Sequence, residues 1–102
     1  MTGGSDFKVD RVPHVDQQLA AMATQARIAG ISDAYFRSLN EMVANLTVRP
    51  LAWGDPRYHT RKEGGVVCAA IHFPLLIHFA VFEDEKVVVI LDVQLLPQFR
   101  QD

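Results

Sequence analysis

Residues 73–94 read FPLLIHFAVFEDEKVVVILDVQ, and this stretch decides the fold class. Two apolar runs flank one charged segment, EDEK at residues 83–86. A strand with one solvated face alternates apolar and polar residues, and these two runs hardly alternate. They predict two neighbouring strands joined by a turn, with a hairpin that is largely apolar on both faces.

The alternation that remains sets a register for this hairpin. With a three-residue turn at 83–85, four apolar pairs oppose one another: Val81 and Val87, Phe79 and Val89, Ile77 and Leu91, Leu75 and Val93. Opposed residues share a face of a sheet, so the odd-numbered positions are predicted to face the core. A turn one residue longer or shorter would mix the two sets and place His78 opposite Leu91.

The sequence before this hairpin predicts a third strand and two helices. Residues 66–73, VVCAAIHF, extend the hairpin to a three-stranded antiparallel meander. Asp16 is the predicted N-cap of a helix that ends before Gly30, and Ser32 is the predicted cap of a second helix that stops at Pro50. Helical spacing assigns the core stripe of the second helix to Phe36, Leu39, Val43 and Leu46, widened by Tyr35 and Met42.

The predicted architecture is a single α+β domain over residues 1–102. An N-terminal helix hairpin packs on one face of an antiparallel sheet of three to four strands. Residues 7–15 supply a further strand or an extended lead-in, and residues 51–65 form a long loop. The ends, 1–6 and 98–102, are expected to be frayed.

Two helices cover one face of such a sheet and leave the other open. On that second face, the even-numbered positions give six candidates for contact with a partner: Leu76, His78, Phe82, Ile90, Asp92 and Gln94. A contiguous exposed apolar patch usually marks an interaction site. Either a partner covers this face, or the loop and the C-terminal tail fold across it. We favour a partner, which is a small protein or a second copy of the chain.

Composition excludes several classes of protein. The chain has 102 residues, a formal net charge of −2 and a pI of about 6.0, which does not suit binding to nucleic acid through bulk charge. Its one cysteine, Cys68, excludes a disulfide within the chain. No apolar run is long enough to span a bilayer, and the N-terminus lacks the features of a signal peptide. We therefore expect a cytoplasmic protein with no membrane contact.

The densest basic cluster lies in the loop at 51–65. It consists of Arg57, His59, Arg61 and Lys62. Beside Trp53 and Tyr58, these side chains are candidates for contact with a nucleic acid or another macromolecular target. The alternative is a solvated loop, with Trp53 as the anchor that packs it on the domain.

A second candidate site combines Cys68, His78 and Asp92. The predicted register places all three on one face, with Cys68 opposite His78. A thiol beside a histidine that a carboxylate orients suits nucleophilic catalysis or metal binding. The alternative is a buried thiol and an interface histidine, and we expect neither a cofactor nor a metal.

The order of elements, together with two segments of sequence, resembles the RelE/ParE family of bacterial type II toxins. The segments are LLIHFAVFEDEKVVVILDVQLLP at 75–97 and WGDPRYHTRKEGGVVCAA at 53–70, and the likeness in topology spans 15–97. It implies a toxin that cuts messenger RNA on the ribosome or blocks DNA gyrase. It also implies a small antitoxin that wraps the toxin and lays a helix or strand on it.

The chain departs from the RNase branch of that family at the positions that carry charge. The resemblance places Leu76 where an arginine is common, Asp92 and Gln94 where a basic pair falls, and Arg100 near the family's terminal arginine or tyrosine. An RNase of this kind uses cations to stabilise phosphate charge, so we assign no catalytic residue. The alternative function is a catalytically silent interaction module of the same fold.

Overall fold

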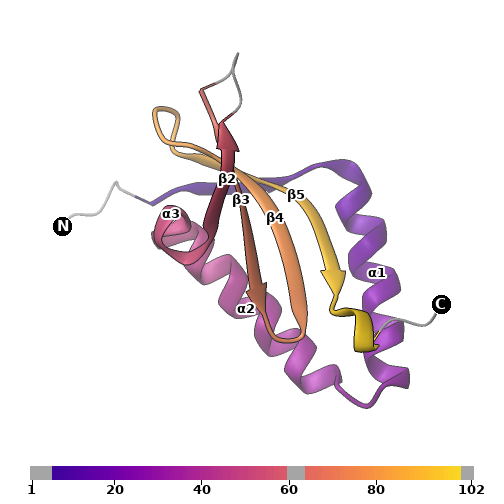
Figure 1. Ribbon diagram of the computed structural model, residues 1–102. Coiled ribbons are helices and arrows are strands. Elements are labelled where there is room, and N and C mark those ends of the chain that lie inside the picture. The colour runs from indigo at the N-terminus through magenta and orange to yellow at the C-terminus, as the bar shows by residue number, and fades with distance from the viewer. Residues whose placement is uncertain (1–5, 60–63, 100–102) are drawn as a thin grey trace.

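The computed structural model describes residues 6–59 and 64–99, and it shows three helices and a five-stranded sheet (Figure 1). In chain order the elements are β1 (Lys8–Arg11), α1 (Pro13–Ile28), α2 (Ser32–Val48), α3 (Pro50–Trp53), β2 (Asp55–His59), β3 (Val66–His72), β4 (Leu75–Phe82), β5 (Val87–Leu95) and the 3-10 turn η1 (Pro97–Phe99). The strand order is β1-β5-β4-β3-β2. This confirms the α+β class.

The sheet is larger than predicted and is mixed, not purely antiparallel. The meander of β3, β4 and β5 is confirmed, and residues 8–11 are a strand that runs parallel to β5. A fifth strand, β2, lies in the segment predicted as a loop and pairs with β3. Its sequence, DPRYH, does not alternate apolar and polar residues, and the side chains of Asp55, Pro56 and Arg57 are exposed. The strand forms because its backbone pairs with that of β3.

The helices differ from the prediction mainly at their starts. Helix α1 begins at Pro13, three residues before the predicted cap, because proline suits the first turn of a helix. Asp16 therefore lies inside that first turn, and neither helix has a side-chain cap at its N-terminus. Gly30 follows α1 with a φ of 76°, the left-handed conformation that ends many helices, as predicted.

The buried stripe of α2 is rotated from the predicted one. Tyr35, Ser38, Met42 and Leu46 are buried, whereas Phe36 is 53% exposed and Val43 is 46% exposed. Two hydrogen bonds explain the rotation. The hydroxyl of Ser38 donates to the backbone oxygen of His72 at 3.0 Å, and that of Tyr35 donates to the backbone oxygen of Leu19 at 2.9 Å. Both side chains therefore point inward, and Met42 lies on the same face of the helix.

The sequence prediction missed the register of the β4–β5 hairpin by one residue over Phe79–Phe82 and by two residues over Leu75–His78. Four residues, 83–86, connect the strands, and Lys86 takes a positive φ of 58°. Val81 therefore lies opposite Val88 and Phe79 opposite Ile90. The register then shifts between His78 and Phe79, so that His78 lies opposite Asp92 and Leu91 is the extra residue of a β-bulge.

The bulge changes which residues of β5 face the core. Above it the buried residues are Val88 and Ile90, and below it they are Val93 and Leu95. Without the extra residue at Leu91, the pattern set by Val88 and Ile90 would point Asp92 into the core, where an unpaired carboxylate is costly.

The core lies between the helices and one face of the sheet. In β4 this face carries Leu75, Ile77, Phe79 and Val81, as predicted, and all four are fully or almost fully buried. Trp53 packs on this core with its ring centroid 5.9 Å from that of Phe79, which confirms its predicted role as an anchor. A Cβ atom on Gly54 would lie 2.5 Å from Cζ of Phe79, so the entry to β2 requires glycine.

Replacing Phe79 or Phe36 with alanine tests which of the two rings belongs to the core. Phe79→Ala should lower the free energy of unfolding by about 3–5 kcal/mol, because it removes a fully buried ring. Phe36→Ala, at the half-exposed position on α2, should cost about 1 kcal/mol or less. Urea denaturation followed by circular dichroism measures both, and equal losses would contradict the rotated stripe of α2.

Candidate functional site

The face of β3, β4 and β5 that points away from α1 and α2 is the candidate site, and we call it the open face. Five of the six predicted contact residues lie on it and are partly exposed: Leu76, His78, Phe82, Asp92 and Gln94. Leu76 is paired with Gln94 and His78 with Asp92, so these four side chains form one cluster. On the open face, Ile71 is 72% exposed and lies opposite Leu76, near Gln94, whereas Val67, Ala69 and Ala80 are buried.

The sixth predicted contact residue, Ile90, was placed on the wrong face. It lies opposite Phe79, is 4% exposed and belongs to the core. The four-residue turn at 83–86 is the reason, because it moves every residue of the upper half of β5 by one position relative to β4.

A histidine and a carboxylate meet on the open face. Nδ1 of His78 lies 3.8 Å from Oδ2 of Asp92, which is an ion-pair distance and too long for a hydrogen bond. The side chain of His78 is 41% exposed and that of Asp92 is 27% exposed. The pair is thus accessible to a molecule that docks on the open face.

Asp92 also forms a hydrogen bond with Gln18 of α1. Its Nε2 donates to Oδ1 of Asp92 at 2.6 Å, and its Oε1 accepts the backbone N–H of Val93 at 3.1 Å. Strand β1 pairs with β5 only as far as Ile90, so the side chain of Gln18 takes the place of a strand along the next part of β5. A lone glutamine on a helix gives no pattern in the sequence, which is why this link was not predicted.

Cys68 does not belong to this cluster, and its predicted position opposite His78 is wrong. The turn before β4 contains only Phe73 and Pro74, so Cys68 lies opposite Phe79 and faces the core. Burial, with a smaller effect from Asp55, raises the pKa of its thiol. A histidine beside a carboxylate can transfer protons, but the described residues supply no thiol nucleophile beside it.

No group of three or more histidine, cysteine, aspartate or glutamate side chains in residues 6–59 and 64–99 could hold a metal ion. None of the side chains that β3, β4 and β5 place on the open face is a lysine or an arginine, and the nearest described cation is Arg57 of β2, which lines a pocket with Ala69, Ile71 and Leu76 at the edge of this face. The chemistry that this cluster offers is therefore hydrogen bonding and apolar contact around one His–Asp pair.

The predicted basic cluster is only partly within the described residues. Arg57 lies in β2 and is exposed, and the backbone of His59 is paired with that of Val66 at the end of the same strand. Arg61 and Lys62 lie outside the described residues. The structure therefore places one cation of the four at the edge of the sheet, next to β3.

Comparison of the chain with protein-family models, with curated proteins and with solved structures found no match in any of the three. Within the described residues, none of the helices has the length and apolar character that crossing a membrane requires.

Gln18 and its neighbour Gln17 provide a matched test of the link to Asp92. Gln18→Ala should lower the free energy of unfolding by about 1–2 kcal/mol, because it leaves the N–H of Val93 and one oxygen of Asp92 without their partner. Gln17→Ala, at an exposed position of the same helix, should change it by less than about 0.5 kcal/mol. Equal effects in chemical denaturation would show that the bonds of Gln18 add no stability.

The thiol of Cys68 should be unreactive in the folded protein. Its raised pKa lowers the thiolate fraction at any pH below that pKa, and its burial blocks the reagent. At pH 8 we expect labelling by a disulfide reagent to be more than about a hundredfold slower than in urea-unfolded protein. Rapid labelling of the native chain would contradict the core position of Cys68.

Proposed function

We propose that the chain is a toxin, or a homologue of a toxin, of a type II toxin–antitoxin system of the RelE/ParE kind. In this proposal it acts in the cytoplasm, and a small antitoxin neutralises it by covering the open face. The observation that carries the proposal is the open face itself, where Leu76, Phe82 and the His78–Asp92 pair are partly exposed. A helix hairpin on one face of a sheet that ends in a meander also supports it.

The charges favour a protein target over messenger RNA. Cleavage of RNA in this fold would need cations near the phosphate, and β3, β4 and β5 supply none on the open face. An apolar surface with a few hydrogen-bonding groups suits contact with a protein instead. Among the targets that the resemblance implies, this favours gyrase over the ribosome-bound message.

The second candidate function is a catalytically silent interaction module that uses the same open face. The same lack of basic side chains supports it, because a module that only binds a protein needs no cations for catalysis. In that case the partner is a small protein or a second copy of the chain, and expression of the chain alone does not harm a cell.

Tightly controlled expression of the whole chain in a bacterium separates the two candidates. The toxin proposal predicts growth arrest, which co-expression of a small protein encoded beside it should lift. Unimpaired growth with soluble, folded protein would overturn the toxin proposal and leave the silent module. In arrested cells, comparison of DNA supercoiling with messenger RNA integrity then identifies gyrase or translation as the target.

Substitutions on the surface test whether the open face binds the partner. Leu76→Glu places a charge on the exposed apolar end of the open face, beside Ile71, and should weaken partner binding at least about tenfold, because an unpaired charge in an interface is costly. Val48→Glu, on the exposed side of α2, should leave binding unchanged. Calorimetric titration with the purified partner measures both, and equal affinities would place the partner elsewhere.

A further inference from the structure

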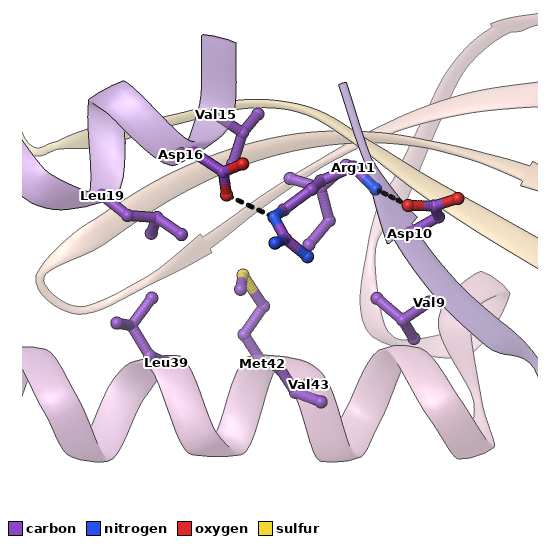
Figure 2. Close-up of a pocket in the computed structure, with 10 residues that line it drawn as sticks. Val9, Asp10, Arg11, Val15, Asp16, Leu19, Leu39, Met42 and Val43 are labelled. Atoms are coloured by element: carbon purple, nitrogen blue, oxygen red, sulfur yellow. Dashed lines mark hydrogen bonds and ion pairs between the residues drawn. The ribbon is translucent and has the colours of Figure 1, made fainter. Parts of the chain in front are cut away.

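A second hollow lies on the other side of the molecule, between β1, the start of α1 and the middle of α2 (Figure 2). Its volume is about 320 Å³, which is at the lower end of the range for small-molecule sites. Its walls are mainly aliphatic and come from three elements: Val9, Val15, Leu19, Leu39, Met42 and Val43. The rotation of α2 that exposes Val43 also opens this hollow, so the sequence prediction did not find it.

One cationic side chain, that of Arg11, lies in this hollow, which we call the groove. Arg11, the last residue of β1, extends its guanidinium between the helices, and Figure 2 shows the terminal nitrogens directed toward Met42. Its Nε donates to Oδ1 of Asp16 at 2.5 Å, which fixes the orientation of the group. No described residue pairs with the two terminal nitrogens, and half of the side chain is exposed. A guanidinium with free N–H groups is thus held beside an apolar cavity.

The two neighbouring carboxylates, Asp10 and Asp16, already accept hydrogen bonds from Arg11. Oδ1 of Asp10 accepts the backbone N–H of Arg11 at 2.8 Å, and Asp16 is held by Nε. Two carboxylates lie beside one guanidinium, so these three side chains carry a formal net charge of −1. This should weaken the binding of an anion, but neither carboxylate occupies the terminal nitrogens of Arg11. The hydrogen bond and charge of Asp16 also raise the pKa of Arg11, which keeps the guanidinium charged.

We propose that this groove binds a small aliphatic carboxylate, with its head on the terminal nitrogens of Arg11 and its tail between α1 and α2. The planar fork of a guanidinium matches a carboxylate, and aliphatic walls match an alkyl tail. The size of the cavity favours a small molecule over a protein helix, which needs a far larger footprint. This inference is independent of the toxin proposal, because the groove and the open face lie on opposite sides of the sheet.

A chain-length series tests the proposal directly. Straight-chain carboxylates from butanoate to decanoate are titrated into the ¹⁵N-labelled full chain, and amide shifts are followed by NMR. We expect shifts at Val9, Arg11, Leu19 and Val43, with affinity that rises about fourfold per methylene until the groove is full. Octan-1-ol should bind at least about fivefold more weakly than octanoate, because it lacks the charged head.

Variants at Arg11 and Val43 test separately the contacts of the carboxylate head and of the alkyl tail. Arg11→Gln should weaken octanoate binding about tenfold, and Arg11→Lys should have a smaller effect, because lysine keeps the charge and loses the fork. The matched control is Arg27→Gln, at an exposed position of α1 outside the groove, which should change nothing. Val43→Phe, at a half-exposed position, should narrow the groove and shift the preference toward shorter chains.

Three results would overturn the proposal. Equal affinities for octanoate and octan-1-ol would mean that the groove is only an apolar hollow. An unchanged affinity in Arg11→Gln, with its spectrum showing a folded protein, would remove the role of the guanidinium. Shifts confined to Leu76, His78 and Phe82 would place the carboxylate on the open face instead.

Discussion

The bulge at Leu91 is the constraint on which the arrangement of this domain depends. Strand β5 must bury Val88 and Ile90 above the bulge and Val93 and Leu95 below it, and these two pairs cannot share a face in a regular strand. One extra residue resolves the conflict at the cost of a local break in the ladder. The same residue turns Asp92 out of the core and places it beside His78.

The functional arrangement follows from that change of face. The helices pack on one side of the sheet, so His78 and Asp92 lie on the other side and are partly exposed. Gln18 holds this part of β5 in place, because it binds both Asp92 and the backbone of Val93 where β1 ends. The toxin proposal and the silent-module alternative both require this surface. They differ in what happens after a partner or a target binds.

The sequence predicted the parts of the structure that burial alone decides. The α+β class, the β3–β5 meander and the core face of β4 all follow from apolar spacing. It did not predict features that depend on one backbone conformation or one distant contact. The positive φ of Lys86 shifts the register of β5, the two-residue turn at Phe73 and Pro74 moves Cys68 into the core, and pairing with β3 creates β2. Among the site residues, Ile90 and Cys68 were misplaced for these reasons.

The most direct test of the account is a set of methyl-to-methyl nuclear Overhauser effects on the native chain. If β5 changes its buried face at Leu91, Ile90 should show contacts to Val15 of α1, and Val93 should show contacts to Met22 further along the same helix. Leu91 and Val89 should show no contacts to either helix. Contacts from Val89 and Leu91 to α1, with Ile90 turned away, would contradict the bulge and remove Asp92 from the open face.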